Sequence, residues 1–126
     1  MAKSTQRNDN VAVQKLLRGK RLLIVGGDPR PQHVQRIQMT LGFSAVEWIE
    51  TRSSDPLGRK AVGAVEQSRA DIVIVLIGLV RHAHAKRLSA TCKESGTLLV
   101  RYRGKSPHPN GIAVAVTNQI GSRLSK

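Results

Sequence analysis

The chain has 126 residues, which is enough for one domain and too few for two. Its 21 Lys and Arg residues against 8 Asp and Glu residues give a formal net charge of +13, so the protein attracts polyanions. Aromatic residues make up only 2% of the chain, which disfavours base-stacking surfaces for RNA, and the one cysteine, Cys92, excludes an internal disulfide.

The sequence predicts neither a membrane-spanning segment nor a secretory signal. No apolar run approaches the roughly 18 residues that a transmembrane helix needs. We expect no secretory signal, because no apolar segment follows the charged first residues. A single cysteine also suits a reducing compartment. We therefore expect a cytoplasmic protein with no membrane contact.

The chain is predicted to comprise a short extension and one folded domain. Residues 1–20 form a basic N-terminal extension with a polar, disordered start and a short helix at 8–19. This helix has capping residues at 8–10 and a stop at Gly19. Residues 21–126 form the single α/β domain.

From residue 21 onward, apolar runs of strand length alternate with segments of helical periodicity. In chain order we predict strands at 21–25, 43–49, 71–77 and 97–102, and helices at 31–41, 56–69, 81–95 and 111–124. Pro31 suits a first helical turn, and Gly42 and Gly96 suit helix ends. The helical positions expected to face the core are Val34, Ile37, Gln38, Leu41, Leu57, Ala61, Ala64, Val65, Ala83, Leu88, Cys92, Ile112, Val116 and Ile120.

The alternation of strands and helices predicts a three-layer α/β sandwich with a four-stranded parallel sheet. Residues 71–77 are a continuous, mostly β-branched run, which is typical of a strand buried on both faces of a parallel sheet. Right-handed crossovers favour the strand order 2-1-3-4, as in half of a Rossmann-like or flavodoxin-like fold. Because so narrow a sheet leaves both edges important, we also expect a homodimer that covers an edge or packs the last helix.

The predicted strand order places a ligand site between the first and third strands, outside their carboxyl ends. The residues that follow these strands are Gly26, Gly27 and Asp28 on one side and Gly78, Arg81 and His82 on the other. The glycine turn could hold an anion on its backbone, or glycine could simply permit the turn. Asp28 could bind a ligand hydroxyl, orient His82, or cap the next helix.

Three histidines are candidate ligands for haem iron or a single metal ion. On a regular helix His82 and His84 point apart and cannot chelate one ion together, although they could in a frayed first turn. His33 could approach from the other turn. His82 is the better candidate for a pocket, where one imidazole against an aliphatic wall could ligate haem, whereas His84 could simply be solvated. Ordinary histidines at a helix N-terminus are the alternative.

Two clusters of basic residues suggest anionic partners. Arg81, Arg101 and Arg103 follow the third and fourth strands, where they suit a phosphate or carboxylate. The second cluster lies before the first strand and could contact a nucleic acid backbone without reading its sequence; it consists of Lys15, Arg18, Lys20 and Arg21. A solvated, solubilising surface explains either cluster equally well.

Motifs for familiar enzyme chemistry are missing from the sequence. The dinucleotide-binding pattern G-x-G-x-x-G, the P-loop pattern and the nucleophile elbow G-x-S-x-G are all absent. No catalytic triad is indicated, the carboxylates are scattered, and Cys92 suits a buried apolar position. Whether the protein is an enzyme stays open, with His82 as general base and Arg81 as oxyanion stabiliser the arrangement available.

The run Leu-Ile-Val-Gly-Gly-Asp at 23–28, the apolar strand at 71–77 and a histidine at the start of the following helix resemble the DUF2325 family. These are small bacterial α/β proteins of largely unassigned function, and the resemblance covers about residues 20–105. The family's Ser-His pair falls on Arg81 and His82, so the histidine carries over and the serine does not. The resemblance implies a compact ligand-binding or regulatory domain. A receiver domain is excluded, because the first and third strands lack the acidic residues that phosphorylation needs.

Three hypotheses follow in order of preference. The first is a binding or regulatory module for a small anionic ligand, haem or a metal ion near Gly26, Gly27 and His82. The second is a nucleic-acid-binding protein that acts through its basic surface. The third is an enzyme that uses His82.

Overall fold

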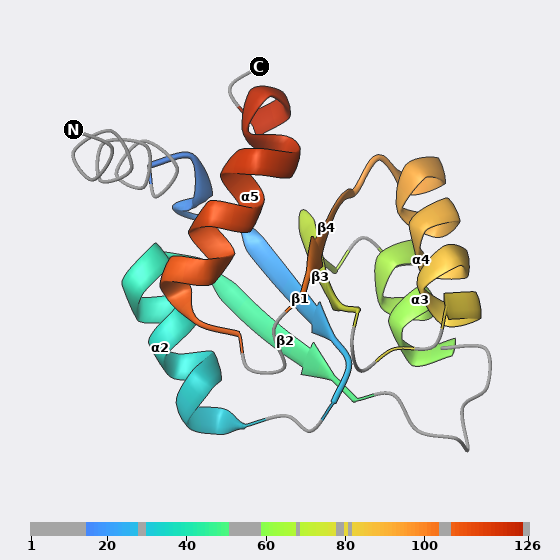
Figure 1. Ribbon diagram of the computed structural model, residues 1–126, viewed down its shortest axis with the longest axis horizontal. Helices are drawn as coiled ribbons and strands as arrows, with labels where there is room; N and C mark the ends of the chain where they lie inside the picture. Colours follow the sequence, from blue (N-terminus) through green and yellow to red (C-terminus); the bar gives the residue numbers. More distant parts are fainter. Residues whose placement is uncertain are drawn as a thin grey trace.

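The protein is an α/β sandwich whose four-stranded, all-parallel sheet has the order β2-β1-β3-β4 (Figure 1). The computed structural model describes residues 15–27, 30–50, 59–67, 69–77, 80, 82–103 and 107–124. The strands are β1 (Arg21–Val25), β2 (Ala45–Ile49), β3 (Ile72–Leu76) and β4 (Leu98–Tyr102). The helices are α2 (Pro31–Leu41), α3 (Arg59–Glu66), α4 (His82–Ser95) and α5 (Pro109–Leu124). The predicted fold class and strand order are confirmed.

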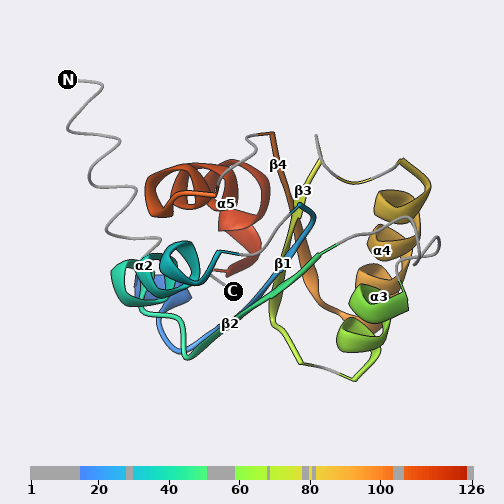
Figure 2. The same ribbon diagram turned by 90° about the horizontal axis from the view of Figure 1, so that it is seen from below.

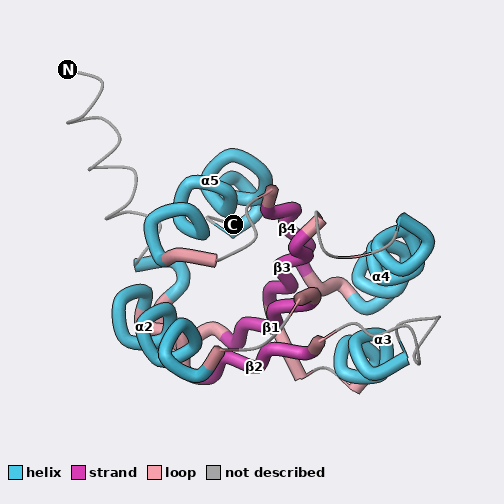
Figure 3. The backbone as a smooth tube through the Cα atoms, turned by 60° about the horizontal axis from the view of Figure 1, so that its bottom comes forward, coloured by secondary structure: helices cyan, strands magenta, loops and turns pink. Residues whose placement is uncertain are grey.

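Two helices cover each face of the sheet. Helices α2 and α5 lie together on one face, and α3 and α4 lie together on the other (Figures 2 and 3). The register aligns Leu23 with Val73 and Val73 with Leu99, and this row faces α3 and α4. The next row, with Ile24 and Ile74, faces α2 and α5. All of β3 is buried, as its β-branched sequence predicts.

Helix boundaries follow local chemistry. Helix α2 has the predicted limits, and Gly42 ends it at φ 75°, with its N–H donated to the Gln38 carbonyl. Helix α5 begins two residues earlier than predicted, because Pro109 fits a first turn and the His108 carbonyl already accepts from the Ile112 N–H. The predicted start of α3 at residue 56 lies outside the described residues.

Most positions predicted to face the core are buried, and one is not. Ile37, Leu41, Ala61, Ala64, Val65, Leu88, Cys92, Ile112, Val116 and Ile120 are buried, and Val34 and Gln38 are partly buried. Leu57 lies outside the described residues. Ala83 is exposed, and His84 takes the inner position instead, because residues 84, 88 and 92 repeat every four residues along one helix face.

The chain contacts the domain before β1 begins. Residues 15–17 form a helical turn, and Leu17 is fully buried in the core on the α2 and α5 side. The predicted disordered start and most of the predicted first helix lie outside the described residues. Among the described helices, none has both the length and the apolar composition to cross a membrane.

Candidate anion-binding edge

All four strands end, and all four described helices begin, on one side of the sheet. We call this side the carboxyl edge; it comprises Gly26, Gly27, Arg30, His33, Glu50, Ile77, Val80, Arg101, Arg103 and His108, with the starts of the helices. The opposite side, where the strands begin, is the amino edge. This arrangement follows from the parallel sheet, because each helix leads from the carboxyl edge back to the amino edge (Figure 1).

The four described helices share an uncommon charge pattern at their starts. None has an acidic residue in its first turn. Helix α3 begins with Arg59 and Lys60, α4 begins with His82, and Arg30 and His108 precede α2 and α5. Helix N-termini carry partial positive charge and favour Asp or Glu, so the Arg and Lys residues there add to the positive potential. The carboxyl edge therefore attracts anions.

Backbone contacts hold the start of α2. Arg30 is the N-cap residue in an extended conformation, and its carbonyl accepts from the N–H groups of His33 at 3.0 Å and Val34 at 3.2 Å. No side chain of the described residues caps the helix. A Ser or Asp at this position would stabilise the helix by about 1 kcal/mol. An anionic oxygen from a ligand could take the place of this missing cap.

Two histidines from different helix starts approach each other at the carboxyl edge. The ring centroids of His33 and His108 are 6.3 Å apart, with their planes tilted by 47°. The backbone N–H of His108 lies 3.4 Å from the Tyr102 hydroxyl. A Cβ at Gly111 would lie 2.6 Å from the same hydroxyl, so glycine lets α5 start close to Tyr102.

Sequence reasoning singled out His33 but missed His108. The signal was present, since His108 precedes Pro109 as Arg30 precedes Pro31. In a parallel sheet, two helices on the same face begin at the same edge. The predicted fold therefore already implied that the two starts lie close together.

Gly26 forms a tightly packed turn at the end of β1. Its N–H donates to the Ile49 carbonyl at 3.0 Å, and its carbonyl accepts from the Trp48 Nε1–H at 2.7 Å. Its φ is 122°, and a Cβ there would lie 2.7 Å from Val80 Cγ2. Both its backbone groups bind within the protein, so an anion at this turn would take its donors from other groups. Gly27, with φ 65°, is partly buried.

Several predicted site residues lie outside the described part of the chain. These are Asp28, Gly78 and Arg81, together with the side chain of His82, whose backbone begins α4. Their proposed contacts with an anion, with haem or with each other stay predictions.

His33 and His84 are on opposite faces of the sheet. His33 belongs to α2, whereas His84 is only 7% exposed on the inner face of α4, so the idea that it is solvated is wrong. The sheet lies between these two helices and keeps the two imidazoles from sharing one metal ion (Figure 3). Within the described ranges, no three His, Cys, Asp or Glu residues gather as a metal site.

Arg101 and Arg103 are both exposed at the end of β4. The backbone of Arg101 is fixed by Gln119 of α5, whose side-chain amide accepts from its N–H at 2.8 Å and donates to its carbonyl at 2.6 Å. Only the side chain of Arg101 thus remains for a ligand. It lies near Lys86 of α4, which lines the same surface hollow.

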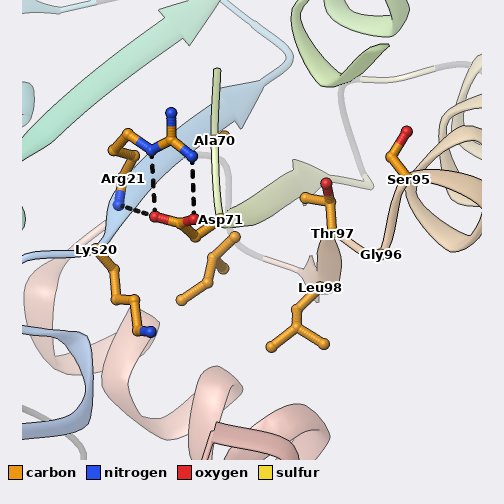
Figure 4. A pocket seen from close by; sticks show the side chains of 9 residues that line it. Lys20, Arg21, Ala70, Asp71, Ser95, Gly96, Thr97 and Leu98 are labelled. Carbon is orange, nitrogen blue, oxygen red and sulfur yellow. Dashed lines mark hydrogen bonds and ion pairs between the residues drawn. The ribbon is translucent and has the colours of Figure 1, made fainter. Parts of the chain in front are cut away.

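The second predicted basic cluster lies at the amino edge. Arg21 Nη2 lies 3.1 Å from Asp71 Oδ1, and its Nε and backbone N–H donate to Oδ2 at 3.3 and 2.9 Å (Figure 4). These hydrogen bonds from Arg21, followed by charge attraction, hold the pKa of Asp71 below its ordinary value against the opposing effect of partial burial. Lys20 lines the same cavity of about 290 Å³, and Lys15 and Arg18 are exposed. Arg21 is thus paired with Asp71, the residue that precedes β3.

Comparison of this chain with protein-family models, with curated proteins and with solved structures finds no match. The resemblance to the DUF2325 family therefore rests on the residues alone.

Proposed function

We propose that this protein is a binding module that takes a phosphate-bearing anion at its carboxyl edge. The observation that carries the proposal is the charge pattern of the helix starts. Four described helices begin at one edge, without an acidic residue in any first turn and with Arg, Lys or His at each start.

This pattern is unfavourable in the free protein. Each helix N-terminus carries about half a positive charge, and an acidic residue there stabilises by about 0.3–1 kcal/mol. Arg30 instead adds a full positive charge at the start of α2, where none of the described side chains forms a cap. A bound anion would neutralise this edge and accept hydrogen bonds from the helix starts. Departures from local preference of this kind are expected at functional sites.

The described residues suggest how an anion would be held. Arg30, His33 and His108 come from the starts of α2 and α5, and the last two lie within reach of one group. One guanidinium group can donate two parallel hydrogen bonds to phosphate oxygens, and Arg30 and Arg103 each supply such a group at the carboxyl edge. Asp28, Gly78, Arg81 and His82 follow β1 and β3 and stay predicted members of the same site. Haem or a single metal ion on His82 is the alternative ligand, and a native mass spectrum of the purified protein would reveal either.

Calorimetric titration with pyrophosphate at low salt tests the proposal. We expect Arg30→Gln to weaken binding by about tenfold, the loss of one charged hydrogen-bonding group. The matched control is Arg18→Gln, which removes one exposed positive charge beside the amino edge. Equal weakening in both variants would contradict a site at the carboxyl edge.

Nucleic acid is the second candidate partner, favoured by the net charge of +13 and by exposed Lys15 and Arg18 beside the amino edge. This interpretation predicts that the logarithm of the affinity for a duplex oligonucleotide falls steeply and linearly with the logarithm of the salt concentration. It also predicts that Lys15→Gln and Arg18→Gln weaken oligonucleotide binding while Arg30→Gln does not. Affinity that is independent of salt would exclude it.

A further inference from the structure

A surface groove runs between α4 and the edge strand β4, on the side of the sheet away from α2 and α5. Its volume is about 610 Å³, and Ile77 and Val80, which follow β3, are among the residues that line it. In Figure 3, α4 stands beside the end of the sheet formed by β3 and β4. The groove shares Ile77, Val80 and Arg101 with the carboxyl edge, but Arg30, His33 and His108, at the starts of α2 and α5, do not line it.

The walls of the groove are positively charged. Lys86 and Lys93 lie two turns apart on one face of α4, and Arg101 comes from β4; all three side chains are exposed. None of the described lining residues is acidic. The groove therefore complements a partner with several negative charges.

The lining of the groove is also partly aliphatic. Ile77 is 37% exposed, which makes it one of the few large apolar side chains open to solvent among the described residues. Ala85 and Ala90 of α4 line the groove as well, and Val80 lines it although it is largely buried. The described lining includes no aromatic side chain on which a nucleobase could stack. Aliphatic and cationic side chains in one groove fit apolar side chains flanked by carboxylates better than they fit a nucleic acid strand.

The neighbouring sheet edge is partly closed to another strand. Gln119 occupies both the N–H and the carbonyl of Arg101, the groups that an added strand would use. A partner in the groove would therefore bind through side chains, as an amphipathic helix does, and not by adding a strand at Arg101.

We propose that the groove between α4 and β4 docks an acidic amphipathic segment of a partner protein. The apolar side chains of this segment lie on Ile77 and Ala90, and its carboxylates pair with Lys86, Lys93 and Arg101.

Fluorescence anisotropy with a labelled synthetic peptide tests this proposal. The probe is a peptide of about 16 residues with leucines at helical spacing and Glu at most other positions. The expected result is that Lys86→Glu and Lys93→Glu each weaken binding by about tenfold. Arg36→Glu on α2, an exposed residue on the opposite face, is the matched charge reversal and is expected to change affinity by less than about twofold.

A second pair of variants tests the aliphatic part of the groove lining without changing the charge. Ala90→Gln fills the groove and is expected to weaken peptide binding, whereas Ala83→Gln, at an exposed position of the same helix, is not. Tight binding of a shuffled peptide with the same composition would overturn the proposal, as would equal weakening by Arg36→Glu. An oligothymidylate that binds more tightly and displaces the peptide would also overturn it and assign the groove to nucleic acid.

Discussion

Gly26 lets two distant parts of the chain meet at the end of β1. Its φ of 122° is unfavourable for other residues, and a Cβ would lie 2.7 Å from Val80 Cγ2 and 3.2 Å from Leu76 Cβ. We expect Gly26→Ala to lower the free energy of unfolding by about 2–3 kcal/mol, since backbone strain and overlap add. Denaturant unfolding measures this loss.

The matched control for this substitution is Gly19→Ala. Gly19 also has a positive φ, of 81°, but a Cβ there meets no atom within 4 Å. We expect a loss of about 1 kcal/mol from strain alone. Equal losses in the two variants would show that overlap of a Cβ with Val80 is not what makes glycine necessary at this turn.

The ion pair between Arg21 and Asp71 makes stability depend on pH. The hydrogen bonds of Arg21 lower the pKa of Asp71 in the folded protein. The contribution of ionised Asp71 to the free energy of unfolding is therefore complete at a pH above the ordinary Asp pKa of about 3.9. The contribution is lost as the pH falls through the lowered folded value. Both side chains are about two-fifths exposed, so solvent screening keeps the effect small.

We therefore expect Asp71→Asn to lower the melting temperature by a few degrees at neutral pH. The difference from the natural chain should shrink as the pH falls below that ordinary value, because the carboxyl group becomes protonated. Melting curves across this range, with Glu94→Gln as an exposed carboxylate control, provide the measurement. A difference that stays constant down to the most acidic pH would contradict this explanation.

Some residue roles could be predicted from the sequence, and others could not. The Gly26-Gly27 turn follows from an apolar strand that ends at two glycines. The contact with Val80 depends on how β1 and β3 pair, and no local pattern encodes it. The pairing of Arg21 with Asp71 likewise joins residues 50 positions apart.

At the scale of single elements, Gln119 protects an edge of the sheet. Its side-chain amide replaces a neighbouring strand at Arg101. We expect Gln119→Ala to lower the free energy of unfolding by about 1 kcal/mol and to increase self-association at high concentration. Analytical ultracentrifugation with Asn118→Ala, at the adjacent exposed amide, as control would measure the second effect.

The same experiment bears on the predicted homodimer. If two chains pair through β4, Gln119→Glu should also favour association, because a carboxylate cannot donate to the Arg101 carbonyl. Unchanged sedimentation of both Gln119 variants would indicate that this edge is not a site of association.

The helices show why sequence patterns predict where a helix begins and ends better than they predict which of its faces is buried. The limits of α2 follow from Pro31 and Gly42, and its buried positions follow from apolar spacing. In α4 the apolar pattern is weak and predicts Ala83 as a core residue, whereas the four-residue repeat places His84 there. A polar side chain on an inner face cannot be identified from hydrophobicity alone.

At the scale of the whole molecule, the parallel sheet brings the helix starts together. The described first turns place basic but no acidic residues at the carboxyl edge, whereas charges of both signs lie at the amino edge, among them Lys15, Arg18, Asp71 and Glu94. The strand order was predictable from the alternation of elements and from crossover handedness. That order also implied that His33, on α2, lies on one face of the sheet, and that α4, which contains His82 and His84, lies on the other. The pairing of His33 with His108 required knowing that α2 and α5 share a face.

The most direct test of the proposed anion site is an NMR titration of ¹⁵N-labelled protein with pyrophosphate at low salt. We expect the largest shifts at backbone amides of the helix starts, such as Gln32, His33 and Gly111, with Ser95 and Thr97 at the amino edge unchanged. Shifts confined to the amino edge, or spread evenly over exposed basic residues, would contradict an anion site at the carboxyl edge.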